Sequence, residues 1–155
     1  MIQRVQSIWL LLAALTLTCM LFLPFLTKNV NGSEFSVYTN GLHQTISDNA
    51  GDTLVVTPFY PLFISNIAIA VLCIVAIFSF RNRTIQKRLA SVAIILTLGL
   101  SFWGFNYAQK IPAGIEGANY GIAAFLPILT ILFCALAIRG IRKDEQLLRS
   151  ADRLR

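Results

Sequence analysis

The chain has 155 residues, of which 56% are hydrophobic and only 13% are charged, and its net charge at neutral pH is +6. A soluble domain usually carries about a quarter charged residues, so this composition argues against an ordinary soluble protein. The way the charges are distributed along the chain indicates a membrane protein instead.

Four stretches of the sequence contain no Asp, Glu, Lys or Arg, namely residues 5–27, 53–80, 89–109 and 117–138. A helix needs about 20 apolar residues to cross a bilayer. We therefore predict four transmembrane helices, at residues 5–26, 59–80, 89–107 and 120–138. The first stretch is too long for a signal peptide and no small-residue cleavage site follows it, so we expect it to be retained as a helix.

The distribution of Lys and Arg predicts the orientation. Arg4, the RNRTIQKR loop (residues 81–88) and the tail (residues 139–155) together carry eleven basic residues, whereas the other side carries only Lys28 and Lys110. Basic residues accumulate on the cytoplasmic side of membrane proteins. We therefore expect both termini and the RNRTIQKR loop to be cytoplasmic.

The outer loop, residues 27–58, is expected to be β-rich. The segment EFSVYTNGLHQTI places Asn40 and Gly41 between two alternating runs, which is the strongest short-range signal for a hairpin. TLVVTPF predicts a third strand, and His43 is expected to be a solvated loop residue. The predicted fold class is thus an all-α membrane protein with four transmembrane helices, a small extracytoplasmic β-rich loop and a cytoplasmic C-terminal helix.

The sequence contains no recognisable catalytic, cofactor-binding or metal-binding constellation. Cys19, Cys73 and Cys134 all fall inside predicted spans without a C-x-x-C motif, which is typical of packing residues. The predicted spans hold no ionisable residue of the kind that couples transport, and polar residues such as Asn66 are expected to bond neighbouring helices or their own backbone. We therefore expect no enzymatic activity, no cofactor, no metal and no small-molecule substrate.

The fourth predicted helix carries two features that concern packing. Gly117, Gly121 and Ala124 stand at i, i+4 and i+7, a spacing that predicts a close helix–helix seam. Pro127 lies near the middle of the same predicted helix, where it would produce a kink.

The tail, AIRGIRKDEQLLRSADRLR, predicts an amphipathic continuation of that helix. At about 100° per residue, one basic stripe forms, and it contains Arg139, Arg142, Gln146, Arg149 and Arg153. A second, apolar arc contains Ile141, Leu148, Ala151 and Leu154. Glu145 is placed to pair with Arg149 at i+4.

Arginine offers a planar fork suited to phosphate or carboxylate, so the stripe could meet lipid headgroups, an RNA surface or a protein. The loop residues Arg81, Arg83, Lys87 and Arg88 would add to the same basic surface. Leu148 and Leu154 favour a protein partner, because a tail that touched only headgroups would not need them.

Three segments, MIQRVQSIWLLLAA, RNRTIQKRL and the tail, resemble a family of small inner-membrane proteins from Bacteroidetes, domain-of-unknown-function family 4293. The resemblance covers the whole chain and implies four helices in a bacterial inner membrane. The family supplies no established activity, so it implies no catalytic residue.

These observations favour a non-enzymatic accessory or structural subunit of a larger inner-membrane assembly, such as one for protein export or membrane insertion. It would dock through its helix seams and its basic cytoplasmic tail. The alternative is a small membrane transporter or ion-conducting protein, and a membrane enzyme ranks third.

Overall fold

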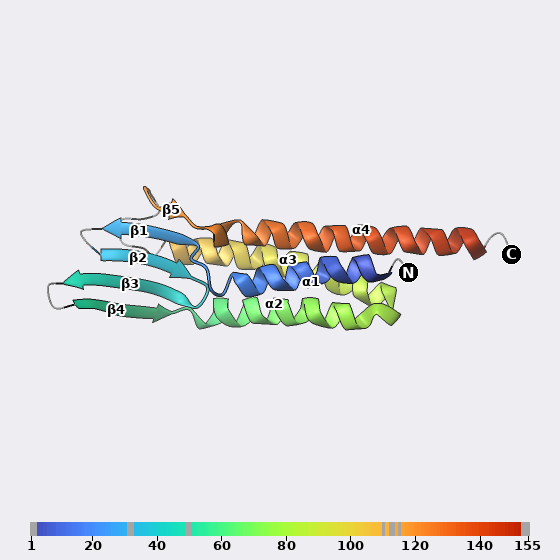
Figure 1. The fold of residues 1–155 in the computed structure, drawn as a ribbon, viewed down its shortest axis with the longest axis horizontal. Coiled ribbons are helices and arrows are strands. Elements are labelled where there is room, and N and C mark those ends of the chain that lie inside the picture. Colours follow the sequence, from blue (N-terminus) through green and yellow to red (C-terminus); the bar gives the residue numbers. More distant parts are fainter. Residues whose placement is uncertain are drawn as a thin grey trace.

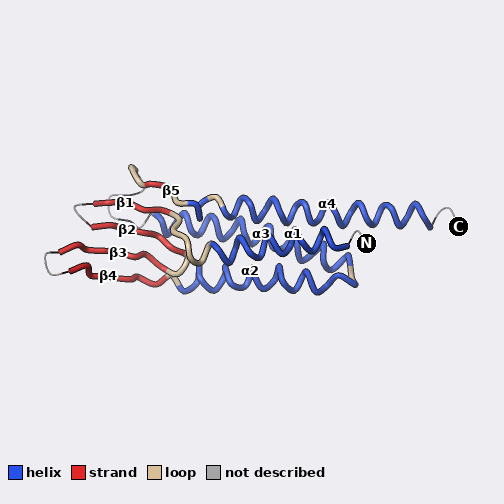
Figure 2. The backbone as a smooth tube through the Cα atoms, viewed as in Figure 1, coloured by secondary structure: helices blue, strands red, loops and turns tan. Residues whose placement is uncertain are grey.

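The computed structural model of the chain describes residues 3–30, 33–48, 51–109, 111, 114 and 116–152. Its elements in chain order are α1 (Gln3–Cys19), β1 (Leu26–Val30), β2 (Ser33–Tyr38), β3 (Gly41–Asp48), β4 (Gly51–Pro58), α2 (Tyr60–Phe78), the 3-10 helix η1 (Ser79–Arg81), α3 (Arg83–Ala108), β5 (Asn119–Tyr120), the 3-10 helix η2 (Ile122–Ala124) and α4 (Leu126–Asp152). Helices and strands occupy opposite halves of an elongated molecule (Figures 1 and 2). We call the two ends the sheet end and the tail end, and both chain termini lie toward the tail end (Figure 1).

The helices form a bundle in which α1 and α3 each pack against both α2 and α4. Three helical segments among the described residues are long and apolar enough to cross a membrane, namely Tyr60–Phe78, Arg83–Ala108 and Ile122–Leu147. The apolar stretch of α1, Val5–Cys19, is shorter. At about 1.5 Å per residue α1 is only about 25 Å long, whereas the hydrocarbon core of a bilayer is about 30 Å thick.

The expectation of an all-α protein with four transmembrane helices is therefore wrong. The structure combines four helices with a five-stranded antiparallel sheet, and about 19% of the chain is strand. The prediction of a helix over residues 5–26 was too long, because the absence of charged residues does not distinguish a helix from an extended chain. Here α1 ends at Cys19, and the sequence LFLPF turns into β1, helped by Pro24, which disfavours a helical residue before it.

The sheet has the strand order β4-β3-β2-β1-β5. The predicted hairpin is confirmed as β2 and β3, but its turn residues are Thr39 and Asn40, because Gly41 pairs with Tyr38. Glycine is required at 41 for a different reason. A Cβ there would lie 2.5 Å from the carbonyl oxygen of Thr57 on β4, which is the third strand that the sequence predicted.

Hydrogen bonds close the junction between the sheet and the bundle. The Phe25 N–H donates to the carbonyl of Val37 at 2.7 Å, and the Phe25 carbonyl accepts from the Gly121 N–H at 2.8 Å. The hydroxyl of Thr39 donates to the carbonyl of Met20, the residue after α1. A buried aromatic pair adds to this junction, since the rings of Phe59 and Tyr107 stack with centroids 4.1 Å apart.

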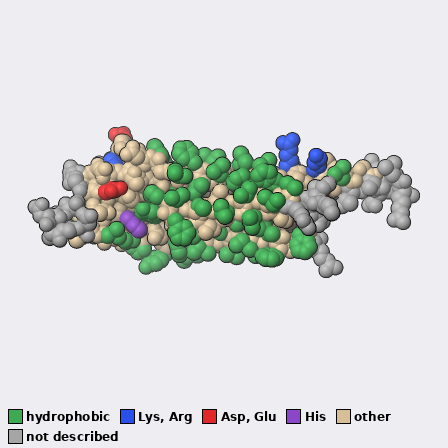
Figure 3. All heavy atoms as spheres, in the orientation of Figure 1, with side chains coloured by type: hydrophobic (Ala, Val, Ile, Leu, Met, Phe, Trp, Pro, Cys, Tyr) green, Lys and Arg blue, Asp and Glu red, His purple; other side chains and the backbone are tan. Residues whose placement is uncertain are grey.

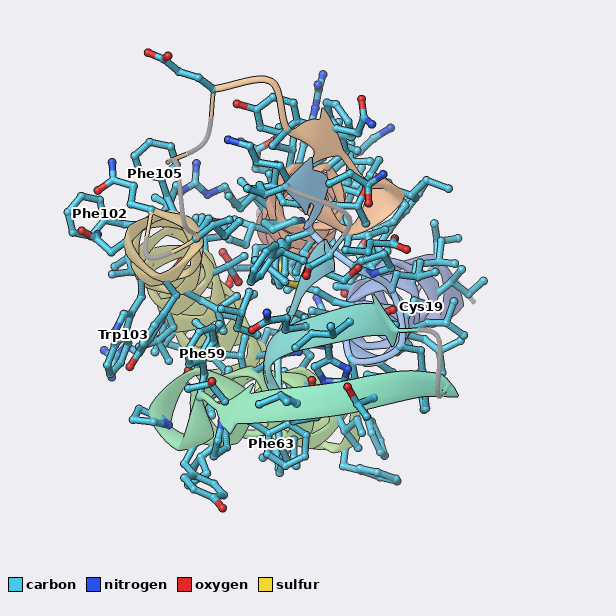
Figure 4. All side chains as sticks on the ribbon, turned by 90° about the vertical axis from the view of Figure 1, so that its left-hand side faces the viewer. Cys19, Phe59, Phe63, Phe102, Trp103 and Phe105 are labelled. Carbon is cyan, nitrogen blue, oxygen red and sulfur yellow. The ribbon has the colours of Figure 1, made fainter. Side chains whose placement is uncertain are left out.

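The bundle carries a wide hydrophobic belt, and charged side chains gather beyond it toward the two ends (Figure 3). Near the sheet end, large aromatic residues border the belt. Phe102, Trp103 and Phe105 extend outward from α3, whereas Phe59 lies inward between helices (Figure 4). Aromatic rings favour the membrane–water interface, so this border fits the edge of a bilayer.

The close approach at Gly121 gives a first prediction. We expect Gly121→Ala to lower the free energy of unfolding by about 1–3 kcal/mol, the range of overpacking substitutions. The reason is that a Cβ at this position would overlap the Pro24 carbonyl oxygen. Thermal unfolding in mild detergent measures the loss.

The matched control is Gly99→Ala, because a Cβ at position 99 on α3 meets nothing within 4 Å. This variant should be as stable as the parent or slightly more so, since alanine is the better helix former. Equal unfolding temperatures for Gly121→Ala and the parent would refute the steric role of Gly121.

Candidate docking site at the tail end of the bundle

At the tail end, α4 continues past the ends of the other helices (Figure 1). Its last bundle-facing residues are Ala137, Ile141 and Asp144, all buried. Their spacing of four and three residues places them on one face of the helix. Gly140 lets α1 approach this region closely, since a Cβ there would lie 3.1 Å from Cγ of Gln6.

A buried polar pair joins α1 to α4 at this point. The side-chain amide of Gln6 donates to Oδ2 of Asp144, and the two residues are only 4% and 6% exposed. A buried carboxylate is costly without a partner. The Gln6 amide therefore stabilises Asp144 in a position where an apolar neighbour would destabilise it.

A second polar contact joins α3 to α4 one residue further on. Nζ of Lys87 donates to both carboxylate oxygens of Glu145, at 2.9 and 3.2 Å. Sequence spacing had instead predicted a pair between Glu145 and Arg149. The side chain of Arg149 lies outside the described residues, and the observed partner comes from another helix because α3 lies alongside α4. The two polar contacts together fix the direction in which α4 leaves the bundle.

The exposed face of α4 at the tail end is basic. Arg139, Arg142 and Gln146 are all exposed, as the predicted stripe requires, and we call these three residues the basic tail face. Lys and Arg side chains are visible at this end of the molecule in Figure 3. Five residues assigned to the stripe or to the apolar arc have side chains outside the described part of the chain, namely Leu148, Arg149, Ala151, Arg153 and Leu154.

The predicted apolar arc needs one correction. Ile141 is fully buried in the bundle, so it is part of the core and not of a free apolar surface. The sequence could not distinguish these two roles because the same helix face begins in the bundle and ends beyond it.

The loop residues fall into different environments. Arg88 is exposed and Lys87 is ion-paired with Glu145, whereas Arg83 is partly buried. Nη1 of Arg83 is buried without a hydrogen-bond partner. The side chain of Arg81 lies outside the described residues. Of the three loop side chains that the structure describes, Arg88 alone is exposed.

The predicted small-residue seam on the fourth helix does not form. Gly117 lies in a turn with φ of +73°, Gly121 follows β5, and Ala124 belongs to η2, so the three residues share no helix face. Pro127 also differs from expectation. It lies in the first turn of α4, where a proline leaves no intrahelical hydrogen bond unmade and causes no kink.

Polar residues in the bundle core behave as expected for membrane helices. Thr16 on α1 and Thr130 on α4 share a hydrogen bond of 2.8 Å, and Nδ2 of Asn66 on α2 donates to the carbonyl of Leu17 at 3.2 Å. Oδ1 of Asn66 is buried without a partner. These bonds connect α1 to both of its neighbours.

Residue types that could carry chemistry are scattered. Cys73 on α2 and Cys134 on α4 are both fully buried free cysteines. His43 lies on β3 with its ring 4.6 Å from that of Tyr38, so its assignment to a solvated loop is wrong. Among the described residues, no three His, Cys, Asp or Glu side chains come together as metal ligands would.

The two edges of the sheet differ. At one edge β5 is only two residues long, and Lys28 of β1 donates to the carbonyl of Gly114 in the neighbouring loop. At the other edge β4 is eight residues long, and its central residues Leu54, Val55 and Val56 are exposed. Short strands and lysines normally protect sheet edges from pairing with other chains. Neither feature protects β4, which is eight residues long and has no lysine from Thr53 to Thr57.

The sequence did not predict that Gln6 and Gln86 are buried near the tail end or that Gly140 allows a close contact between helices. It predicted for Asp144 only that this residue lies off the basic stripe. Gln6 and Gln86 are buried near the tail end, yet glutamine carries no charge and did not interrupt the apolar count. A usable signal was the position of Asp144, seven residues after the buried Ala137 and therefore on the same helix face.

The comparisons with known proteins agree with this architecture only at the level of family. The model of the family described as "Domain of unknown function (DUF4293)" matches residues 2–154. The chain therefore belongs to this family. A comparison with curated proteins gave no match.

The buried pair at the tail end gives a second prediction. We expect Gln6→Leu to lower the free energy of unfolding by about 1–3 kcal/mol, because the Asp144 carboxylate would stay buried without its donor. The double variant Gln6→Leu with Asp144→Leu should recover most of that loss, which a double-mutant cycle measures. Gln146→Leu, on the exposed face of α4, is the control and should be nearly neutral. Additive effects of the two substitutions would contradict a direct interaction.

Proposed function

We propose that this protein is a non-enzymatic accessory subunit of a larger assembly in a bacterial inner membrane, such as one for protein export or membrane-protein insertion. The observation that carries the proposal is the tail end of α4 with its exposed basic face. Two contacts from other helices, Gln6 to Asp144 and Lys87 to Glu145, fix its direction. Arg139 and Arg142 then face solvent on a helix that is already oriented.

The proposed orientation places the tail end in the cytoplasm and the sheet end outside. It is supported by the basic residues of the tail and of residues 81–88, which lie together at one end of the molecule (Figure 1). Basic loops are retained on the cytoplasmic side. The belt of exposed apolar residues between the two ends would then meet lipid (Figure 3).

A fixed basic helix suits docking to a protein with an acidic surface. A flexible tail loses conformational freedom on binding, whereas a pre-oriented helix loses less. The guanidinium groups of Arg139 and Arg142 can each bind a carboxylate in a bidentate manner. Phosphate-rich RNA and lipid headgroups offer similar charge, and they are the alternative outcomes of the test below.

The exposed edge of β4 supports the proposal that this protein assembles with a different protein. The strands run along the axis of the bundle, so a two-fold axis normal to the membrane would place two β4 strands parallel (Figure 1). With that axis, the outward-facing N–H and C=O groups of one β4 lie at the same height as the identical groups of the second β4. In a parallel ladder, the facing groups of the two strands are offset along the strands by one residue. The edge therefore fits an extended segment of another protein better than a second copy of this chain.

One observation favours the alternative function, a small transporter or ion-conducting protein. Oδ1 of Asn66 is buried in the bundle core without a partner. Buried unpaired acceptors are rare and can mark a path for water or a small solute. Flux through liposomes that contain only this chain, abolished by Asn66→Leu, would support this alternative over the accessory role.

A third prediction concerns orientation. We expect Thr53→Cys, on the exposed sheet end, to react with a membrane-impermeant maleimide in intact cells made permeable only at the outer membrane. Gln146→Cys should react only after the inner membrane is disrupted. Both variants are made in a background with Cys19, Cys73 and Cys134 replaced by alanine. The reverse labelling pattern would overturn the proposed orientation.

A fourth prediction tests docking through the basic tail face. We expect Arg139→Gln with Arg142→Gln to reduce the amount of chain in its large complex several-fold, measured on native gels after mild solubilisation. Arg139→Lys with Arg142→Lys keeps both charges but loses the bidentate fork, and this matched control should retain more of the complex than the glutamine variant and less than the parent. Higher salt should weaken the parent complex, because exposed charges are screened over about 8 Å at physiological ionic strength.

The remaining outcomes of this experiment are equally specific. If the glutamine variant keeps the complex in full, the tail acts only as a topology signal and contacts lipid headgroups. If nuclease treatment releases the parent chain, the partner is RNA. Val55→Lys tests the edge of β4 in the same assay and should also weaken the complex.

A further inference from the structure

A pocket of about 270 Å³ lies between α3 and α4 directly below the sheet. Ser101, Gly104, Phe105 and Ala108 of α3 form one wall. The opposite wall and the roof come from β1, β5, η2 and the start of α4, and they include Leu26, Tyr120, Ala124, Phe125 and Ile128. The pocket forms because α4 begins only at Leu126, so at this level α3 faces η2 and Phe125 instead of a regular turn of α4.

Gly104 is the residue that leaves the pocket open. It lies seven residues after Thr97 and four after Leu100, both buried, so it faces the bundle. A Cβ at Gly104 would nevertheless meet nothing within 4 Å. By contrast, the glycines at 41, 121 and 140 each accommodate a close contact inside the chain. Glycine is a weak helix former, and no contact within the described structure requires it at 104.

The chemistry of the lining excludes water as the natural content. Nearly all lining side chains are apolar. The hydroxyl of Ser101 already donates to the carbonyl of Thr97 at 2.8 Å, and the only other lining hydroxyl belongs to Tyr120, whose side chain is exposed. Apolar cavities of this kind stay dry. Any occupant should therefore be hydrocarbon.

The surroundings decide which hydrocarbon. The pocket opens onto the hydrophobic belt, and its rim carries the exposed rings of Phe105, Tyr120 and Phe125. Phe105 points outward from α3 in Figure 4. In a bilayer, lipid chains lie against this rim continuously. A transmembrane helix is 10–12 Å wide with its side chains and needs a longer groove, whereas a single acyl chain can enter.

We propose that this pocket binds one acyl chain of a membrane phospholipid from the leaflet on the sheet side. The chain enters between Phe105 and Phe125 and lies over Gly104, and Leu26 of β1 and Tyr120 of β5 cover it. The headgroup stays at the level of the aromatic border. The bound chain thereby fills the gap between α3 and α4 and supports the sheet from below. This inference does not depend on the accessory role.

The test compares two glycines of the same helix. The purified chain is delipidated in mild detergent, dioleoyl phosphatidylethanolamine is added, and bound lipid is counted by native mass spectrometry. The parent should retain one lipid that resists dilution. Gly104→Leu should bind it at least tenfold more weakly, because the new side chain fills the pocket. Gly99→Leu fills a separate pocket between α2 and α3 and leaves the pocket at Gly104 unchanged, so this variant should bind the lipid like the parent.

Photocrosslinking locates the lipid without any substitution. A phosphatidylcholine with a diazirine on one acyl chain, reconstituted with the parent chain, should label peptides that contain residues 101–108 and 120–128 above all others. Ala124→Leu narrows the pocket from the opposite wall and should reduce that labelling several-fold, even if Gly104→Leu fails to fold. Uniform labelling along the belt, or full lipid retention by Gly104→Leu, would overturn the proposal. The proposal would also be overturned if the unsubstituted protein bound no lipid and instead bound a second protein at this rim.

Discussion

The two hydrogen bonds of the Phe25 backbone close the junction between the sheet and the bundle. One joins the residue before β1 to Val37 of β2, and the other joins it to Gly121, which follows β5. Unpaired backbone groups are costly wherever water is scarce, so this boundary has to be closed by the chain itself. Closing it with strands delays the start of α4 to Leu126, and the pocket over Gly104 follows from that delay.

The tail end is held by side chains rather than by backbone. The Gln6 amide and the Lys87 ammonium both bind acidic residues of α4, one buried and one partly exposed. An exposed ion pair alone contributes little to stability. Removing the only donor to a buried carboxylate is strongly destabilising. The direction of the projecting helix therefore depends mainly on the bond between Gln6 and Asp144. Arg139 and Arg142 gain a defined orientation from it.

The surfaces available for interaction lie at three levels of the molecule. The basic tail face is at one end, and the open edge of β4 is at the other (Figure 1). The pocket between α3 and α4 lies between them, directly below the sheet. Each suits a different kind of contact, namely acidic groups, an extended backbone and hydrocarbon. An accessory subunit that connects a membrane assembly to components on both sides would use surfaces arranged in this way.

The sequence alone determined the apolar segments that become α2, α3 and α4, the hairpin of β2 and β3, and the exposure of Arg139 and Arg142. These features depend on local composition and on helical or strand period, which neighbouring residues specify. Only the tertiary structure decided that LFLPF leads into β1, that Asn119 and Tyr120 add a fifth strand, and that Gly117, Gly121 and Ala124 share no helix face. It alone also paired Gln6 with Asp144 and Lys87 with Glu145. The physical reason is that these contacts join segments far apart in the chain, and backbone pairing and burial across such distances leave no periodic trace in the residues themselves.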